Sequence, residues 1–201
     1  MDPEGTTIVL DVYPSKLFST LKKITKDTLQ MDDNGTVTIS KLYENTFFGK
    51  RQKNKWPSGT KLIRALINSK KRILIYGYYK CTGSYCYPNN FKVAVFYYKN
   101  NQLVKGSGSK VTITLCFQDN SKKNPLYIVL AHELIHAYRY INGMGINRNW
   151  ICKNHKCNYD ECFVVGLSHS SDSLKAYSCQ FTENGIRNEH GITKRTYYTG
   201  W

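Results

Sequence analysis

Residues 127 to 138 place two histidines and a glutamate inside an apolar run, Tyr-Ile-Val-Leu-Ala-His-Glu-Leu-Ile-His-Ala-Tyr. His132 and His136 are four residues apart, so on an α-helix both imidazoles leave the same face, one turn from each other. This spacing lets two imidazoles bind one tetrahedral metal ion. Glu133 follows the first histidine, where its carboxylate reaches a metal-bound water rather than the metal. We therefore predict a helix over 126–141 that packs its apolar side chains into a core and turns the histidines toward a cleft.

The alternative is a buried helix that carries two histidines by chance. The chain has 5 histidines among 201 residues, so the pentapeptide H-E-x-x-H is expected by chance far less than once. This motif is typical of zinc hydrolases. We therefore expect one catalytic Zn²⁺ per chain.

Length and composition indicate an ordinary globular protein. A chain of 201 residues, 41% of them hydrophobic, suits a single domain over 1–201, with 1–120 as scaffold and 121–201 as the catalytic part. No apolar run approaches the ~18 residues that span a bilayer, so we expect no membrane partner. The first residues, Met-Asp-Pro-Glu-Gly, are acidic where a secretory signal is basic, and we expect no Sec-type signal there.

The chain is strongly basic, with 29 lysines and arginines against 14 acids and a net charge of +15. This charge favours an anionic partner, which is an acidic protein surface, a nucleic acid or a membrane face. The basic residues are spread along the chain, with clusters at 22–23, 50–55 and 70–72. The equally weighted alternative is a solvated surface that keeps the protein in solution.

The 7 cysteines cannot all pair within one chain because their number is odd. A globular chain of this size does not need disulfides, and we expect mostly reduced thiols, as in a reducing cytosol. Two alternatives stay open. One is the disulfide pairs Cys81–Cys86 and Cys152–Cys157. The other is a second zinc held by the segment Cys152 to Cys162, although its Cys-x4-Cys-x4-Cys spacing matches no standard zinc knuckle.

Hydrophobic periodicity predicts a mixed α+β fold with a mixed sheet packed on the H-E-x-x-H helix. We expect helices over 15–30, 61–69 and 126–141, and strands over 6–13, 36–39, 72–79, 92–98 and 110–117. The segments 80–91 and 142–158 are loop-like and are expected to rim the active cleft.

A catalytic zinc site needs a third protein ligand and an open position for water. Residues 139 and 142 are Arg and Asn, so the short H-E-x-x-H-x-x-G-x-x-H pattern is not met and this ligand must come from further along the chain. Carboxylates fit the role best, with two histidines as less favoured choices. The candidates are Asp160, Glu161, Asp172, Glu183 and Glu189, then His155 and His169.

The segment Asp160-Glu-Cys-Phe-Val-Val-Gly-Leu167 resembles the acidic pair, apolar run and glycine of NleD-like zinc metalloproteases, which are bacterial effectors. Clostridial neurotoxin light chains share a similar arrangement. The resemblance implies a zincin-like fold, with Glu161 as the third zinc ligand and Asp160 as a residue that orients a histidine or an arginine. Asp160 departs from the usual Glu-Glu pair.

The stretch 182–198 is similar to the sequence T-E-N-x-x-R-x-E-x-G-[IL]…R-x-x-Y of the same family. In the neurotoxin-like pattern, the R-x-x-Y pair stabilises the oxyanion of the tetrahedral intermediate. The resemblance thus assigns this role to Arg195 and Tyr198, with Tyr197 as the alternative tyrosine.

The same stretch also carries helix signals. Thr182 is expected to cap a short helix that starts at Glu183, and Gly191 to end it. We expect Glu183, with Arg187 and Glu189, to form a structural ion-pair set around this helix rather than to bind metal.

The resemblance covers nearly the whole chain, weakly before residue 120, and the stretch 145–158 is not typical of the family. It implies a zinc endopeptidase that a bacterium secretes and delivers to the host cytosol, where it cuts a MAP-kinase-type protein with an acidic docking surface. We expect a monomer and no nucleic-acid partner. Two alternatives are a protease toxin domain with another target and a non-catalytic basic protein with a structural zinc. Glu133 argues against the non-catalytic alternative, because a structural zinc site closed by four protein ligands has no use for a general base.

Overall fold

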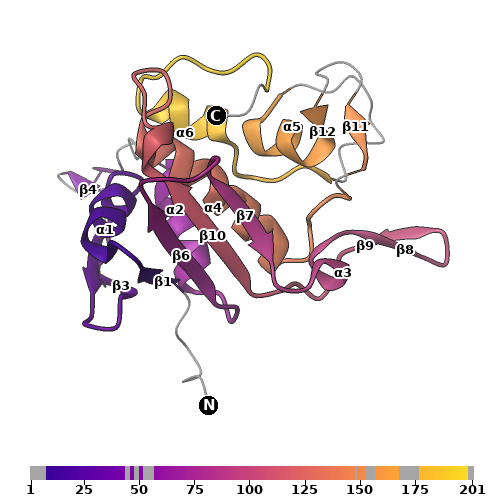
Figure 1. The fold of residues 1–201 in the computed structure, drawn as a ribbon, viewed down its shortest axis with the longest axis horizontal. Helices are drawn as coiled ribbons and strands as arrows, with labels where there is room; N and C mark the ends of the chain where they lie inside the picture. The colour runs from indigo at the N-terminus through magenta and orange to yellow at the C-terminus, as the bar shows by residue number, and fades with distance from the viewer. Residues whose placement is uncertain are drawn as a thin grey trace.

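The computed structural model of the chain describes residues 8–43, 46–47, 50–51, 57–147, 149–152, 157–167 and 177–198. A six-stranded mixed sheet lies at its centre, with the strand order β2-β3-β1-β6-β10-β7 (Figure 1). The strands β1 (Ile8–Asp11), β6 (Ile73–Tyr78) and β10 (Val111–Cys116) are parallel. The outer strands β2 (Thr28–Met31), β3 (Thr36–Lys41) and β7 (Tyr85–Pro88) run antiparallel to their neighbours.

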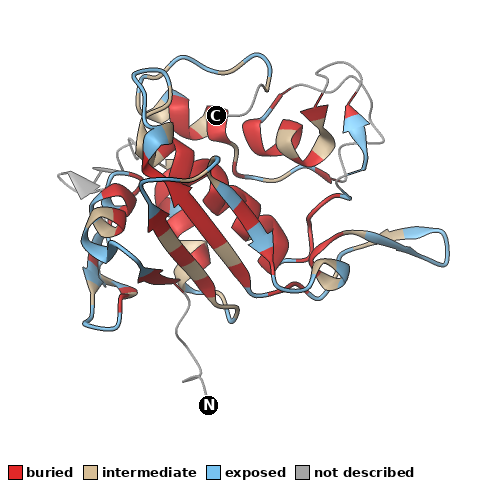
Figure 2. Cartoon of the chain, in the orientation of Figure 1, coloured by how far each residue is buried: buried red, intermediate tan, exposed pale blue. Residues whose placement is uncertain are grey.

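Three helices cover one face of this sheet: α1 (Pro14–Lys22), α2 (Pro57–Ile67) and α4 (Leu126–Ile141). The strand residues that point toward them, such as Ile8, Ile75 and Ile113, are fully buried (Figure 2). Burying one such side chain contributes roughly 1.5–3 kcal/mol to stability. The main core therefore lies between the sheet and α4, and it holds α4 in a defined place.

Short elements complete the structure. These elements are short helices, a 3-10 turn and small strand pairs. The helices are α3 (Phe91–Ala94), α5 (Tyr159–Val165) and α6 (Glu183–Glu189), and the turn is η1 (Phe117–Asp119). The pairs are β4 (Thr46–Phe47) with β5 (Lys50–Arg51), β8 (Tyr97–Lys99) with β9 (Gln102–Val104), and β11 (Ile151–Cys152) with β12 (Cys157–Asn158). The hairpin of β8 and β9 projects away from the body, while α5 and α6 both pack against α4.

The predicted fold class is confirmed: the protein is a mixed α+β structure, zincin-like, with a mixed sheet packed on the helix that carries the two histidines. The prediction for 126–141 matches α4 at both ends. Among the described residues, no helix has the length and apolar character needed to cross a membrane.

Two predicted elements are wrong. The expected helix 15–30 ends at Lys22, and its last part is β2, because the chain turns after Ile24 and Asp27 bonds the Tyr43 backbone. The expected strand 92–98 begins instead with α3, because the Asn90 side chain accepts a hydrogen bond from Lys92 N and caps a helical turn. The expected loop 80–91 also contains β7.

The expectation of mostly reduced thiols is also wrong, as are both suggested pairs. The disulfides are Cys81–Cys116 and Cys157–Cys162. Cys81 follows the end of β6, and Cys116 is the register partner of Tyr78, the last residue of β6, which brings these two sulfurs together. Cys86 instead points from β7 into the core. Within the described part of the chain, no cysteine joins a group that could hold a metal.

Candidate metal centre

The two histidines project from a helix whose position is set by its burial. All residues from Ile128 to Ala137 of α4 are buried, including His132 and His136. The helix begins after Pro125, where the Asn120 side chain accepts a hydrogen bond from Leu126 N at 2.9 Å. The four-residue spacing places the two imidazole centroids 4.9 Å apart on one side of the helix.

Glu161 is presented by the first turn of α5. The Asn158 side chain caps this helix by accepting a hydrogen bond from Asp160 N at 2.7 Å, and Gly166, with φ 82°, ends it. A left-handed residue of this kind favours glycine. The disulfide Cys157–Cys162 spans the start of the helix. A cap, a disulfide and a glycine terminator thus hold seven residues in helical form beside α4.

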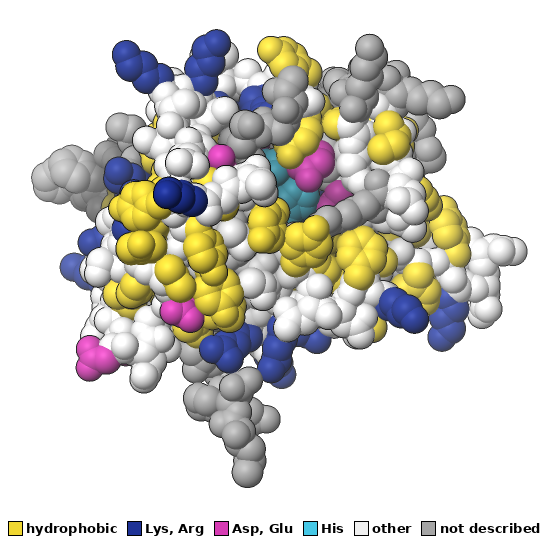
Figure 3. Space-filling model, in the orientation of Figure 1, with side chains coloured by type: hydrophobic (Ala, Val, Ile, Leu, Met, Phe, Trp, Pro, Cys, Tyr) yellow, Lys and Arg dark blue, Asp and Glu magenta, His cyan; other side chains and the backbone are white. Residues whose placement is uncertain are grey.

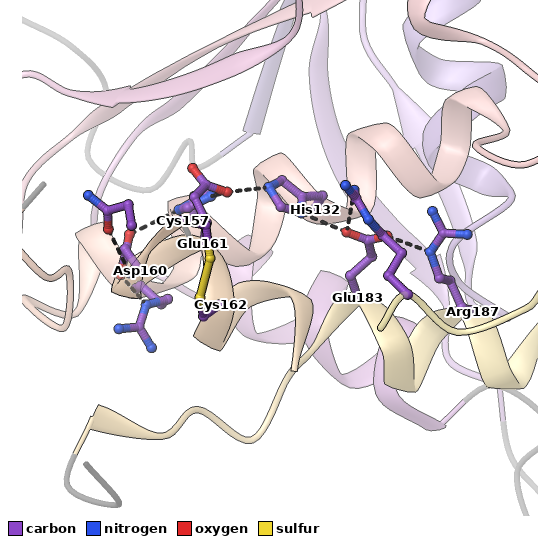
Figure 4. Close-up of polar contacts among 11 residues, drawn as sticks. His132, Cys157, Asp160, Glu161, Cys162, Glu183 and Arg187 are labelled. Carbon is purple, nitrogen blue, oxygen red and sulfur yellow. Dashed lines mark hydrogen bonds and ion pairs between the residues drawn. A yellow bond between two sulfur atoms is a disulfide. The ribbon is translucent and has the colours of Figure 1, made fainter. Parts of the chain in front are cut away.

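The three side chains converge on one point, and Figure 4 shows Glu161 directed at the His132 ring. Glu161 Oε2 lies 3.1 Å from His132 Nε2 and 3.2 Å from His136 Nε2. The three donor atoms lie within 4.8 Å of one another. Two imidazole nitrogens and one carboxylate oxygen are the donor set of many catalytic zinc sites, with a fourth position left for water.

The other ring nitrogen of each histidine contacts a different carboxylate. His132 Nδ1 is 2.8 Å from Glu183 Oε2, and His136 Nδ1 is 3.1 Å from Asp160 Oδ2. Figure 4 shows Glu161 and Glu183 on opposite sides of the His132 ring. Each carboxylate is placed to accept the Nδ1 proton and to fix the ring orientation, and Nε2 of each ring points toward the convergence point, where it could bind a metal.

Both orienting carboxylates are themselves anchored by buried arginines. Asp160 Oδ1 accepts a hydrogen bond from Arg139 Nε at 2.8 Å, and Glu183 Oε1 accepts one from Arg187 Nε. Both carboxylates and both guanidinium groups are almost fully buried. Breaking such a pair by removing one partner is strongly destabilising, so each histidine is held by a rigid carboxylate–arginine unit.

The charges at the site shift the pKa values of its groups. Burial lowers the pKa of His132, but the bonds to Glu161 and Glu183 raise it overall to about 9. Burial also acts against His136, whose pKa the Glu161 and Asp160 charges raise to about 10. Burial raises the pKa of Glu161, yet the two imidazoles hold it well below its usual range. The cluster is thus an electronegative point that favours a positive charge.

A cavity of about 270 Å³ opens beside the cluster. Its wall includes Glu133, which follows His132 on α4 and is 3% exposed, and Tyr198. The Tyr198 ring is stacked on His132, with centroids 5.9 Å apart, whereas Tyr197 is 62% exposed. The other lining residues are Ser84, Tyr85, Cys86, His136, Tyr140, Asn158, Asp160 and Glu161.

Arg195 is held next to this wall by its backbone. The Asn184 side chain donates to Arg195 O at 2.8 Å and accepts from Arg195 N at 2.7 Å. The Arg195 guanidinium lies 3.5 Å from Glu183 Oε2 and 4.9 Å from the centre of the Tyr198 ring. Asn184 and Glu183 are neighbours on α6, so this one helix positions both Arg195 and His132.

The structure separates the candidates for the third donor. Glu161 lies beside the Nε2 atoms of both histidines. Asp160 and Glu183 instead contact the Nδ1 atoms. Glu189 lies elsewhere, where it accepts a hydrogen bond from Ser58 N of α2 at 2.7 Å. Asp172, His155 and His169 lie outside the described residues. The expected cap of α6 by Thr182 is present, and so is the Glu183–Arg187 ion pair.

Sequence reasoning missed two roles, those of Glu183 toward His132 and of Asn184 toward Arg195. The contact of Glu183 with His132 joins positions 51 apart, and no local pattern shows it. Asn184 was also passed over. Its position next to Glu183 in the T-E-N stretch was visible in the sequence, but its bonds to Arg195 depend on how the chain folds back after α6.

The fold and the converging His, His and Glu donors define a zincin-like metallopeptidase arrangement. A comparison with protein-family models matches residues 20–198 to Peptidase_M91, which is described as an effector protein. The chain belongs to this family, and it is therefore a protease of the effector class that acts on a host protein. A comparison with curated proteins finds no match.

Proposed function

We propose that the chain is a zinc-dependent endopeptidase that a bacterium delivers into the host cytosol, where it cleaves a signalling protein of the MAP-kinase type. The observation that carries the proposal is the meeting of His132, His136 and Glu161 beside a cavity that Glu133 also lines. The family match supports peptidase activity and a host protein as the substrate.

The donor set fits zinc. Two imidazoles and one carboxylate converge, and separate carboxylates orient both imidazoles, which is the usual surrounding of a zinc-bound histidine. A zinc ion there would act as a Lewis acid toward the scissile carbonyl and the attacking water. A structural site would be closed by a fourth protein ligand. Within the described residues the group has three members and borders a cavity, which favours the catalytic alternative.

Glu133 is suited to move the proton. Glu133 lines the cavity one residue after His132, and the residue is almost fully shielded from solvent. We assign it the role of general base, which takes a proton from the attacking water and passes it to the leaving amine. Such proton transfer contributes about 10²–10⁴-fold to a rate.

Arg195 and Tyr198 are suited to stabilise the oxyanion. Tyr198 lines the cavity, and burial together with the Glu161 charge raises its pKa, so that its hydroxyl stays protonated and can donate. Arg195 places a permanent positive charge beside the Tyr198 ring. Hydrogen-bond donors of this kind, directed at developing negative charge, are each worth about 3–4 kcal/mol in a transition state.

The edge of the sheet beside the cavity offers a backbone with which a substrate segment can pair. β7 is the edge strand of the sheet, and its residues Tyr85 and Cys86 line the cavity that contains Glu133. An extended peptide that adds to this edge would bring a carbonyl beside the metal cluster. The MAP-kinase target rests on the family resemblance, and the charge of +15 supports it because an acidic surface on the kinase would attract a basic protease.

The experiment is cleavage of a recombinant MAP kinase by the zinc-loaded protein, followed by intact-mass analysis. We expect two fragments from a single cut, and none with Glu133→Gln or after zinc removal by a chelator. Glu133→Gln should retain one zinc, since Glu133 is not a ligand. Full activity of Glu133→Gln would contradict the mechanism. Cleavage of other host proteins but not of the kinase would favour the alternative target.

A further inference from the structure

The second face of the sheet, opposite α1, α2 and α4, carries a different set of side chains. The pairing registers place residues in two rows across four strands. The first row is Val9, Leu74, Thr112 and Tyr87, and the second is Asp11, Tyr76, Thr114 and Tyr85. Tyr78 extends the second set along β6. Because register partners point to the same side, these residues share one face.

Tyrosines make up the outer layer of this face. Tyr78, Tyr85 and Tyr87 are 38%, 44% and 50% exposed, and Thr114 beneath them is 7% exposed. Tyr85 and Tyr87 contact each other edge to face at 5.3 Å, and Tyr76 and Tyr78 lie 6.4 Å apart. We call Leu74, Tyr76, Tyr78, Tyr85 and Tyr87 the tyrosine face. Figure 3 shows hydrophobic side chains, tyrosines included, gathered over this part of the sheet.

The tyrosine face is continuous with the catalytic cavity. Tyr85 belongs to both, since it lies in the second row of the sheet and also lines the cavity with Glu133 and His136. In Figure 3, the hydrophobic side chains reach the hollow in which the histidine is seen. A protein whose cleaved segment occupies the cavity can therefore extend its adjoining surface over this face.

Charge on the face favours an acidic partner. Lys80 follows β6 and Lys110 precedes β10, and both are exposed at opposite ends of the strands. Lys16 lies at the end near Lys80, where its Nζ is 4.3 Å from the centre of the Tyr79 ring. Asp11 is the one carboxylate in the two rows. The apolar centre and basic margins complement a surface of apolar side chains with carboxylates around them.

We propose that the tyrosine face is a docking surface for the folded body of the protein substrate, separate from the segment that is cut. The proposal rests on the proposed endopeptidase function. Tyrosine offers a large, rigid contact area with a hydrogen-bonding end, and it is enriched among residues that dominate binding energy. Single-stranded RNA is the less favoured partner, because Asp11 would repel phosphates and the Tyr85 and Tyr87 rings meet edge to face rather than as parallel platforms.

The test compares two substrates, a whole MAP kinase and a short peptide that contains only the segment of the kinase that is cut. The variant Tyr76→Ser with Tyr78→Ser removes two rings of the face that both lie on β6, away from the edge strand. The matched control is Tyr97→Ser with Tyr98→Ser, which removes two exposed tyrosines from the β8–β9 hairpin. For the face variant we expect KM for the kinase to rise about tenfold or more, with kcat and peptide cleavage within about twofold of wild type. The control should match wild type on both substrates.

Each other outcome has a definite meaning. An unchanged KM for the kinase, with peptide cleavage intact, refutes the docking surface and leaves the proposed function standing. An equal rise in KM for the hairpin control also refutes it, since the effect is then not specific to the face. If wild type cuts neither kinase nor peptide, the proposed function fails and the docking proposal falls with it. Binding of poly-uridine RNA that the face variant loses would assign the face to RNA instead.

Discussion

Replacing Glu183 by glutamine should weaken zinc binding although Glu183 is not among the three converging donors. Its Oε2 orients His132 through Nδ1 at 2.8 Å, while Oε1 accepts from Arg187. A glutamine can present an oxygen to only one of these two donors, and its NH₂ group then faces the other. Loss of such an orienting carboxylate costs about 10–100-fold in metal affinity, or about 1.4–2.7 kcal/mol.

The same change should also destabilise the fold. Arg187 is 2% exposed and would lose the buried carboxylate of Glu183, although it keeps its bonds to Lys123 O, Thr193 O and Asn124 Oδ1. Removing one partner of a buried ion pair costs about 3–5 kcal/mol, a large part of the total stability of a domain. Zinc affinity must therefore be measured at low temperature on protein whose folded state circular dichroism has verified.

The assay is competition with a chromophoric chelator, and Glu189→Gln is the matched control. Glu189 is a glutamate on the same helix, but its carboxylate bonds to Ser58 N and Gly59 N at the start of α2. We expect zinc affinity to fall about 10–100-fold in Glu183→Gln and to stay at the wild-type value in Glu189→Gln. Folded Glu183→Gln with wild-type zinc affinity would refute the orienting role.

Three further predictions concern other residues. Arg195→Ala and Tyr198→Phe should each lower kcat by about 10²–10³-fold with little change in KM or zinc content, measured by steady-state kinetics. Asn184→Leu should lower kcat in the wild type but not in an Arg195→Ala background, because Asn184 acts by holding the Arg195 backbone. The third is Asp27→Asn. Burial raises the pKa of Asp27, but its bonds to Arg64 and to Tyr43 N lower the pKa overall. The contribution of Asp27 to the free energy of unfolding is therefore present at neutral pH, and it is lost as the pH falls through the folded-state pKa. Urea unfolding should show a loss of about 1.5–3 kcal/mol at pH 7 that disappears in acid.

Features that depend on local spacing were predictable from the sequence. The helix 126–141 and its two histidines were found because the 3.6-residue period, the apolar flanks and the motif all agree there. The helix of Thr182 to Glu189 was found for a similar reason, since a threonine cap and a following glycine mark its ends. Glu161 came from the resemblance rather than from spacing.

Features that depend on long-range contacts were not predictable in this way. Leu17, Leu21, Ile24 and Leu29 have helical spacing and are all buried, but Leu29 is buried from a strand, so burial alone did not reveal the change of element. β7 is short and ends in Pro88, and its pairing with β10 makes it a strand. The Cys81–Cys116 disulfide follows from which strand ends meet, and the positions of seven cysteines in a sequence do not disclose this.

Some signals were present and were not used. Asn90 and Asn158 are both helix caps, and each precedes a short helix that the apolar pattern alone did not indicate. Gly166 follows α5 at a left-handed position, as glycine often does at a helix end. Helix caps, taken together with apolar periodicity, indicate α3 and α5.

The most direct test of the central claim is the zinc content per chain of the wild type and of Glu161→Ala, purified without added metal. The account predicts about one zinc in the wild type and a large loss in Glu161→Ala, because Glu161 supplies one of three converging donors. A wild-type protein that binds no zinc, or a Glu161→Ala variant that keeps a full zinc with wild-type affinity, would contradict it.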